Sequence, residues 1–567
     1  MCNISFSVST ATKQNWERLG VENYNERLSK RANKTQSSKR FIPMECLHSI
    51  SSATIKNVIH IVETENVHIS DALFSLAYKK IHRIINKKGK EWFYEQYSHL
   101  KLNDSLFSLA IPDAQEFLGT VYQSLLTEGE KNKRGSYYTP RHIVEQMISN
   151  FNFDNNQKII DPACGSGAFL LSLSCENPNL IYGVDNDPIA VMITCANLLF
   201  KYSTIDFLPN IIEMDFLSAP SLFDAKEQQD FRNMKFDYIV TNPPWGSAKR
   251  SGLVHNNLFS DELFSCFLFE SLNRLKTNGY LSFLLPYSFL NVKNHSNIRK
   301  YIYEHCCIEK ITSYPNVFSN VITEFVSVSI SNKARNDCFV FADNEKNERQ
   351  IKYKKTPSYT IDMNTDKDNE IIRRVRKKGE FTLSKSIWGL GIVTGDNKNK
   401  LFDMQIEGSE PIYTGKEVKS FVLSNPRKYV VYDRTNFQQA AKDEIYRAKE
   451  KLIYKFISKK LVFAYDDKQS LCLNSANILI PNIPSLSIKS VMALLNSKLY
   501  QFIYAKSFGQ IKILKGNICE LKFPKLTSLE DKELSDLVFS DKEMIDAWIY
   551  DYYSISLEEQ LYIEKEI

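Results

Sequence analysis

The sequence has no long apolar run, no evident export signal and no C-x-x-C pattern of cysteines. The longest candidate for a membrane span, near residue 280, is short and broken by Pro286, whereas a spanning helix needs about 20 apolar residues. Residues 1–16 lack a basic region followed by an apolar stretch, so no secretory signal is expected. The eleven cysteines include no C-x-x-C pair, which favours a reducing cytoplasm and indicates no metal site. We therefore expect a cytoplasmic globular protein of two or three domains, with neither a membrane partner nor a metal.

The net charge of +6 conceals a strongly basic block. Residues 331–525 contain 36 Lys and Arg against 21 Asp and Glu, a balance of +15, whereas the final 42 residues contain 3 against 12, a balance of −9. A basic region of this size favours a polyanion such as nucleic acid as the partner. A lysine-rich surface that meets only solvent stays open as an alternative.

The order of apolar segments predicts a helical region followed by an open α/β sheet. Residues 1–115 are expected to be helical, because apolar side chains in 69–88 recur at spacings of three and four. Residues 116–335 alternate short apolar runs with helix-like stretches, which indicates a doubly wound, mostly parallel sheet with helices on both faces. The charged residues 336–380 are expected to form a linker or an insertion, and 381–567 a further domain of mixed α and β structure.

The first strand of this sheet leads into the turn D-P-A-C-G-S-G, residues 161–167. In open α/β sheets ligands bind beyond the carboxyl ends of the strands, and Gly165 and Gly167 would let the backbone pass close to one. No Lys-Ser or Lys-Thr follows, so a phosphate-binding loop is not expected. The next strand ends at Asp185, 20 residues after Gly165, where an acid can hold two ribose hydroxyls. Its neighbour Asp187 precedes a proline and is expected to cap a helix.

The third strand ends in Asp215 and Phe216. The carboxylate could accept a hydrogen bond from an amino group, and the ring could cover a flat heterocycle. Three successive strand ends of this kind predict a nucleoside pocket without a phosphate site.

The fourth strand ends in N-P-P-W, from Asn242 to Trp245. Each residue before a proline is restricted to extended conformations and each proline fixes its own φ, so the stretch is stiff. Its acceptors, the Asn242 side-chain oxygen and the Pro243 carbonyl, suit a donor with two hydrogens such as an exocyclic amine, while Trp245 offers a face to a flat base. Accepting both N–H groups would free the lone pair of the amine for attack on a methyl group, so positioning would do most of the work. Pro-Pro turns at strand ends are common, but they do not explain the flanking Asn and Trp.

These motifs resemble those of the γ-class amino-methyltransferases of DNA, specifically the N6-adenine methyltransferases of prokaryotic restriction–modification systems. The resemblance begins near residue 117, continues to the C-terminus and rests on seven motifs: F-L-G-T-V-Y (117–122), R-G-S-Y-Y-T-P (134–140), D-P-A-C-G-S-G-A-F (161–169), G-V-D-N-D-P (183–188), D-F (215–216), N-P-P-W (242–245) and Y-P-N-V-F (314–318). It implies a class I S-adenosylmethionine-dependent methyltransferase fold. It also implies methyl transfer from S-adenosyl-L-methionine to an adenine that is flipped out of double-stranded DNA.

The resemblance further implies roles for individual residues. The cofactor would contact the T-P segment, the glycine turn and the next two strand ends, namely Tyr138, Thr139, Pro140, Asp161, Ala163, Gly165, Gly167, Asp185, Asp215 and Phe216. The target adenine would be held by Asn242, Pro243, Pro244 and Trp245, with Phe318 packed on its other face.

The C-terminal region resembles the specificity domain of stand-alone members of this family. The resemblance rests on three segments, 388–398, 411–418 and 494–502, and the region overlaps the basic block. Such a domain would grip phosphates and read base edges. The candidate DNA-binding residues are Thr394, Asn397, Lys398 and Lys416, although turn formation is the favoured interpretation of the Gly-Asp-Asn segment that includes Asn397.

Several alternatives stay open. They are methylation of cytosine, of RNA or of a protein glutamine, a modification subunit that borrows its specificity from another chain, and a DNA-binding module without activity. Asn242 favours adenine over cytosine, and the long C-terminal block favours a chain with its own specificity. Residues 1–110 contain no convincing P-D…(D/E)-x-K nuclease motif, so the chain is expected to methylate without cutting and to have a separate cognate restriction endonuclease.

Overall fold

The structure is a computed structural model that describes residues 40, 42, 50–127, 129–131, 139–149, 151, 154, 156–219, 221, 225–246, 262–314, 324–343, 347–356, 358–508, 513–539 and 542–567. The described residues up to Asp362 form one compact unit, and those from Met363 onward form another. No helix in the described ranges is long and apolar enough to cross a membrane.

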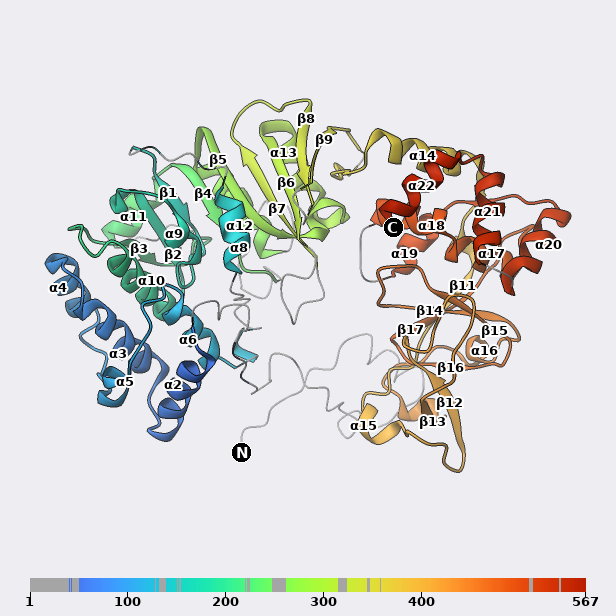
Figure 1. Cartoon of the computed structure of the whole chain (residues 1–567), viewed down its shortest axis with the longest axis horizontal. Coiled ribbons are helices and arrows are strands. Elements are labelled where there is room, and N and C mark those ends of the chain that lie inside the picture. The colour runs from blue at the N-terminus through green and yellow to red at the C-terminus, as the bar shows by residue number, and fades with distance from the viewer. Residues whose placement is uncertain are drawn as a thin grey trace. The chain divides into compact units, whose positions relative to one another are not determined.

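One sheet organises the first unit. Nine strands among the described residues pair in the order β3-β2-β1-β4-β5-β7-β6-β8-β9 (Figure 1). The pairs from β3 through to β5 are parallel, whereas β7 is antiparallel to both β5 and β6. The strands are β1 (Ile159–Asp161), β2 (Ile181–Asp185), β3 (Asn210–Glu213), β4 (Phe236–Thr241), β5 (Leu275–Pro286), β6 (Cys307–Tyr314), β7 (Phe325–Ser331), β8 (Cys338–Ala342) and β9 (Glu348–Lys352).

The strand order reverses between β1 and β4. From β1 the chain continues through β2 to β3 on one side, and then returns to build β4 and β5 on the other. In open α/β sheets this switch point is where ligands bind, beyond the carboxyl ends of the strands. The predicted doubly wound, mostly parallel fold is therefore confirmed, and it brings the ends of β1 and β4 next to each other.

Helices cover the sheet and extend its core. The described helices of this unit are α2 (Ser52–Thr64), α3 (Ile69–His82), α4 (Lys87–Gln96), α5 (Asp104–Ser108), α6 (Phe117–Leu125), α8 (Arg141–Ile148), α9 (Ala168–Ser172), α10 (Pro188–Lys201), α11 (Lys226–Arg232), α12 (Leu263–Arg274) and α13 (Ser296–His305). Helix α10 is buried along most of its length, because α9 and the sheet lie on one side of it and the N-terminal helices on the other.

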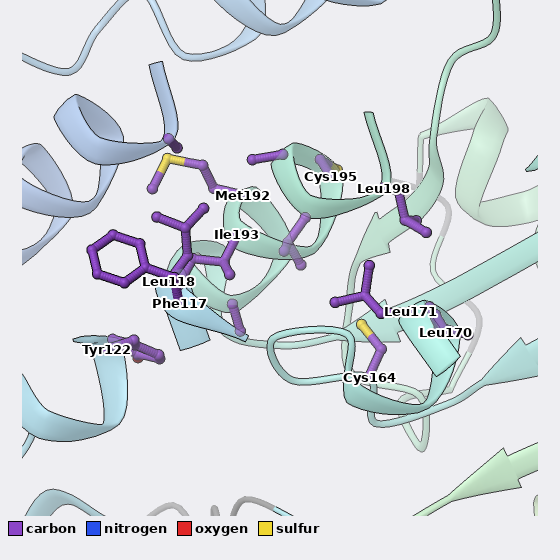
Figure 2. Close-up of a cluster of buried hydrophobic side chains, with 14 of the residues drawn as sticks. Phe117, Leu118, Tyr122, Cys164, Leu170, Leu171, Met192, Ile193, Cys195 and Leu198 are labelled. Carbon is purple, nitrogen blue, oxygen red and sulfur yellow. The ribbon is translucent and has the colours of Figure 1, made fainter. Parts of the chain in front are cut away.

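The N-terminal helices share one hydrophobic core with the sheet. Phe117 and Leu118 of α6 point toward Met192 and Ile193 of α10, while Leu170 of α9 lies on the other side of α10 (Figure 2). All five side chains are fully or almost fully buried. Described residues on both sides of position 115 thus pack as a single body. The helices α3, α4 and α6 pack against α10 on the side away from the sheet.

The second unit contains smaller sheets and a helical cluster. Its described strands pair in the orders β11-β17-β14-β15, β13-β12-β16 and β10-β18. The strands are β10 (Gly379–Phe381), β11 (Ile387–Leu390), β12 (Ser409–Tyr413), β13 (Lys428–Val431), β14 (Lys451–Lys455), β15 (Phe463–Asp466), β16 (Leu471–Cys472), β17 (Ala476–Ile480) and β18 (Phe523–Pro524). The helices are α14 (Asp366–Lys378), α15 (Asn397–Lys400), α16 (Asp443–Tyr446), α17 (Ile488–Asn496), α18 (Lys498–Phe508), α19 (Lys515–Glu520), α20 (Ser528–Asp536), α21 (Lys542–Tyr552) and α22 (Leu557–Glu566). The predicted mixed α and β structure is confirmed.

The charged stretch 336–380 differs from the simple linker or insertion that its composition predicts. It contains β8 and β9, which complete one edge of the large sheet, and helix α14 of the second unit. In β9 only Ile351 is buried, and every second residue, namely Glu348, Gln350 and Lys352, is exposed to solvent. An edge strand of this kind carries many charged side chains, which explains why its sequence looks like a connection.

Candidate active site

The turn after β1 is held by a buried carboxyl and two left-handed glycines. Asp161 is 1% exposed and its Oδ1 accepts a hydrogen bond from the Ala163 backbone N–H at 3.0 Å. Burial raises the pKa of the Asp161 carboxyl to about 7. Gly165 has φ +52° and Gly167 has φ +89°, in a region that only glycine adopts without strain. The turn itself therefore requires both glycines.

Space lies beside the first of these glycines. A Cβ placed on Gly165 would meet no atom within 4 Å, whereas one on Gly167 would lie 3.2 Å from the Thr194 side chain. Thr194 also donates from its hydroxyl to the Gly165 carbonyl at 2.7 Å, so α10 fixes the turn from behind. The open side of Gly165 fits the predicted cofactor, and residues 161–167 include no Lys or Arg that would favour a phosphate.

Asp185 lies directly against this turn. Its Oδ2 accepts the Gly165 N–H at 2.8 Å and its Oδ1 accepts the Asp187 N–H at 3.0 Å. Burial raises the pKa of Asp185. A carboxylate offers about four acceptor sites, so both oxygens can still accept from the hydroxyls of a ribose. The glycine turn and the acid that the sequence places 20 residues apart are thus joined by a hydrogen bond.

Asp187 has the structural role expected from its position before a proline. It caps α10 by accepting the Ile189 N–H at 3.1 Å, with Pro188 as the first helical residue. Tyr122 of α6 donates its hydroxyl to the other oxygen of Asp187. Helix α6 therefore contacts the turn after β2 through a polar bond as well as through the core, and no local pattern in the sequence indicated this bond.

Asp215 and Phe216 follow the end of β3 but have different environments. Asp215 is exposed, and its Oδ1 accepts the Leu217 N–H at 2.9 Å. Phe216 is only 3% exposed, stacks on Phe267 of α12 with ring centroids 5.4 Å apart, and has the Arg274 guanidinium 4.9 Å from its ring centroid. Phe216 is therefore a packed part of the wall at this strand end.

N-P-P-W begins immediately after the last residue of β4. The Asn242 side-chain NH₂ donates to the Thr139 hydroxyl at 3.0 Å, and Thr139 is 4% exposed. This bond joins the predicted T-P segment to the predicted catalytic strand end across 103 positions of sequence. Pro243 is buried and Pro244 is half-buried, as expected for a stiff exit from the sheet.

Trp245 is supported from one side by an aromatic ring that the sequence pattern did not single out. Its indole stacks on Phe325, the first residue of β7, with ring centroids 4.5 Å apart and an interplanar angle of 19°. Phe325 is fully buried. The tryptophan is therefore half-buried, and Phe325 fixes the tilt of its ring. Phe325 opens an apolar run, but only the pairing of β7 with β5 brings it to the end of β4.

Three features lie at the carboxyl ends of neighbouring parallel strands, and therefore on the same side of the sheet. They are the glycine turn after β1, the acid at the end of β2 and N-P-P-W after β4. The family described as N-6 DNA Methylase matches residues 113–386, the part of the chain that contains all three. The chain therefore contains an N-6 DNA methylase domain. The expectation of an adenine-specific DNA methyltransferase is confirmed at the level of the family. A TaqI-like C-terminal specificity domain matches residues 410–526.

Curated relatives of this chain come from restriction–modification systems. The Type II methyltransferase M.VspI of Vibrio sp. (strain 343) is 28% identical over 353 residues, which cover 59% of this chain and 83% of the relative. The Type II methyltransferase M.HincII of Haemophilus influenzae is 25% identical over 35% of this chain and 38% of its own. The Type II restriction enzyme and methyltransferase RM.Eco57I of Escherichia coli is 22% identical over 78% of this chain and 60% of its own. The last two matches thus cover less than two thirds of the relative.

A solved structure supports the fold of both units. The match to the Type IIL restriction-modification enzyme MmeI, determined in complex with DNA, covers 93% of this chain and 94% of the MmeI chain. The TM-score is 0.53 and the sequence identity is 13%, so the likeness concerns the fold alone.

Two of the predicted site residues lie outside the described residues, namely Tyr138 and Phe318. Thr139 and Pro140 are described, and Pro140 is the N-cap residue of α8. Tyr314, the start of the Y-P-N-V-F motif, ends β6 and is buried.

The predicted DNA-binding residues lie on two tight turns of the second unit. Thr394 is 2% exposed, and its hydroxyl and Asn397 are hydrogen-bonded at the start of α15. Gly395 has φ +78°, and Asp396 caps α15 by accepting the Asn399 N–H at 3.3 Å. These features favour a structural role for Thr394, whereas Asn397 and Lys398 are exposed.

Lys416 is exposed on the second of these turns. Glu417 is 3% exposed and accepts both the Thr414 hydroxyl, at 2.6 Å, and the Thr414 N–H, at 2.9 Å. A Cβ on Gly415 would lie 2.7 Å from the Ser475 carbonyl oxygen, so only glycine fits there without a shift. The T-G-K-E segment, residues 414–417, is therefore held in place by these contacts, and Lys416 is its exposed side chain.

Proposed function

We propose that this chain transfers a methyl group from S-adenosyl-L-methionine to the N6 atom of an adenine within one specific duplex sequence. The observation that carries the proposal is the position of N-P-P-W. It begins at the carboxyl end of β4, next to β1 and its glycine turn, in a sheet whose order reverses at that point. A base held there would have its amine close to whatever the glycine turn holds.

The cofactor would be held by the residues that gather at the ends of β1, β2 and β3. When bound, it supplies an electrophilic methyl group. The turn from Asp161 to Gly167 would take its methionine end, Asp185 the ribose, and Asp215 with Phe216 the adenine. Thr139 and Pro140, with Tyr138 before them, would close over it. The space beside Gly165 and the acceptor capacity left on Asp185 support this assignment.

The target amine would be held by two acceptors on a stiff segment. The Asn242 side-chain oxygen and the Pro243 carbonyl would each accept one N–H of the adenine amine, which leaves the nitrogen lone pair free to attack. Trp245, braced by Phe325, would pack on the flipped base. No strong base takes part before attack, because the geometry presents the lone pair.

The chain would carry its own sequence specificity. The TaqI-like specificity domain supports this, as does the basic balance of the same region. We infer a host-protective enzyme of a prokaryotic cytoplasm, paired with a separate cognate endonuclease. RM.Eco57I is described as both restriction enzyme and methyltransferase, so magnesium-dependent cleavage of DNA by the purified chain would contradict this part of the proposal.

Replacement of Asn242 tests the proposed chemistry. Asn242→Ala should lower single-turnover methyl transfer to unmethylated plasmid DNA by roughly 10²–10³-fold, the cost of removing one preorganised group at a reacting centre. Its affinity for S-adenosylmethionine should stay within a few-fold. Asn179→Ala, an exposed substitution just before β2 at the opposite end of the strands, is the matched control and should keep full activity. Retained turnover in Asn242→Ala would contradict the proposed role of Asn242 as an acceptor for the target amine.

A further inference from the structure

The amide of Asn242 must face one way round to serve as an acceptor. A side-chain amide has an oxygen that accepts and an NH₂ that donates, and a half-turn about its last torsion exchanges them. The amine of adenine also donates. An inverted Asn242 would point a donor at a donor and would repel the group that it should hold.

One contact is made by this amide in the orientation that an acceptor role needs. The Asn242 NH₂ donates to the Thr139 hydroxyl at 3.0 Å, which leaves the oxygen as the group that faces away from Thr139. Thr139 is 4% exposed, so little water competes for this bond. The contact lies within the first compact unit, at the end of β4.

The two residues that form this hydrogen bond, Thr139 and Asn242, each have a restricted backbone conformation. Thr139 precedes Pro140, and Asn242 precedes Pro243, and a residue before a proline is confined to extended conformations. Pro140 is in turn held by α8, whose Ile143 N–H donates to the Pro140 carbonyl at 3.0 Å. Asn242 directly follows the fully buried last residue of β4. The hydrogen bond thus joins two residues whose own backbone conformations are restricted.

We propose that Thr139 is a positioning residue for methyl transfer. Its hydroxyl holds the Asn242 amide with NH₂ toward Thr139 and oxygen toward the target amine. The proposal rests on the proposed function of Asn242, and it gives the T-P segment a task on the side of the base in addition to the cofactor contact that the family resemblance implies. The two tasks predict different kinetics, because a cofactor contact affects the binding of S-adenosylmethionine and a positioning contact affects the transfer step.

Two substitutions at Thr139 separate these tasks. Thr139→Val keeps the shape and removes the hydroxyl, and Thr139→Ser keeps the hydroxyl and removes a methyl group. We expect Thr139→Val to slow single-turnover methyl transfer to unmethylated plasmid DNA by roughly 3- to 10-fold, the effect of about one neutral hydrogen bond. The dissociation constant for S-adenosylmethionine should change by less than about two-fold, and Thr139→Ser should restore the rate.

A change at Asn242 provides the second test. Asn242→Asp puts an oxygen on either side of the group, so its orientation no longer matters. The transfer rate of the double variant, Thr139→Val with Asn242→Asp, is compared with that of Asn242→Asp alone. The penalty of Thr139→Val should then fall below about two-fold.

Three results would overturn the positioning role. The first is a normal transfer rate in Thr139→Val, and the second is weaker binding of S-adenosylmethionine with an unchanged rate. The third is a penalty of Thr139→Val that is the same whether or not Asn242→Asp is also present. If Asn242→Ala is inactive while Thr139→Val is normal, only the positioning role fails. If Asn242→Ala is active, the proposed function of Asn242 fails together with the positioning role of Thr139.

Discussion

Single side chains at the carboxyl ends of the strands combine structural tasks with proposed chemical ones. Asp161 shows this most clearly, because it closes the turn through the Ala163 N–H and is buried at the point where the cofactor would lie. Its pKa is raised from the ordinary value of 3.8 to about 7 by burial. A carboxyl with a raised folded-state pKa contributes stability that is present below its unfolded pKa and is lost as pH rises through the folded one. The charge on Asp161 should therefore destabilise the fold progressively between about pH 4 and pH 7.

Asp161→Asn removes this pH dependence and keeps an oxygen for the Ala163 N–H. We expect its free energy of unfolding to rise relative to that of the unsubstituted chain as pH increases from about 5 to about 8. Urea unfolding at several pH values measures the difference. Asp215→Asn, at an exposed carboxylate, is the matched control. Parallel pH profiles for Asp161→Asn and the unsubstituted chain would show that burial does not hold the proton on Asp161.

Several site residues could be predicted from the sequence because their signals are local. The prolines and glycines around Gly165 and Asn242 restrict their own backbone, and the spacing from Gly165 to Asp185 reflects one strand–helix–strand unit. Three contacts were not predictable in this way, namely the Thr139–Asn242 bond, the support of Trp245 by Phe325 and the Tyr122–Asp187 bond. Each of them depends on tertiary packing between segments that are distant in sequence.

At the scale of elements, apolar content determined which helices and strands the sequence could predict. Strands β1 and β4 and helix α10 are buried and apolar, and the sequence pattern located all three. Strand β9 and helix α14 were not predicted because each buries only a narrow strip: Ile351 in β9, and mainly Ile371, Ile372 and Val375 in α14. Their remaining surface is charged, and a high density of charge is also typical of a connection.

The pairing of β14 with β15 includes a buried ion pair. Lys451 donates to Asp466 at 2.5 Å and to the Tyr446 carbonyl at 2.7 Å, and the two charged side chains are 0% and 1% exposed. Lys451→Met leaves a buried carboxylate without its counter-charge and should lower the free energy of unfolding by about 3–5 kcal/mol. The double variant Lys451→Met with Asp466→Leu should recover part of this stability in urea unfolding. Equal stability of the single and double variants would show that the pair is not coupled.

At the scale of the whole molecule, two regions of opposite net charge correspond to the two proposed tasks, methyl transfer and DNA binding. Residues 151–330, which carry most of the proposed cofactor and base site, contain 13 Lys and Arg against 18 Asp and Glu, a balance of −5. Residues 331–525 have the balance of +15 and overlap the match to the specificity domain. The phosphate backbone should therefore be held mainly by the second unit.

Neutralising exposed lysines of the second unit tests this division. Exposed lysines there include Lys398, Lys416, Lys419, Lys459 and Lys460. Their combined replacement by Gln should weaken binding to duplex DNA. It should also reduce the slope of log affinity against log salt by up to about 0.9 for each phosphate that is no longer neutralised. The control set consists of exposed lysines of the N-terminal helices, Lys56, Lys87 and Lys88. If the control set weakens binding and the first set does not, the DNA surface lies elsewhere.

The most direct test of the central claim is the modification state of DNA in cells that express the chain. Sequencing that reports modified bases should find N6-methyladenine at one recurring sequence, and expression of Asn242→Ala should leave that sequence unmodified. An unmodified genome with the active chain, or methylation at cytosine in its place, would contradict the assignment of N-P-P-W as a clamp for the adenine amine.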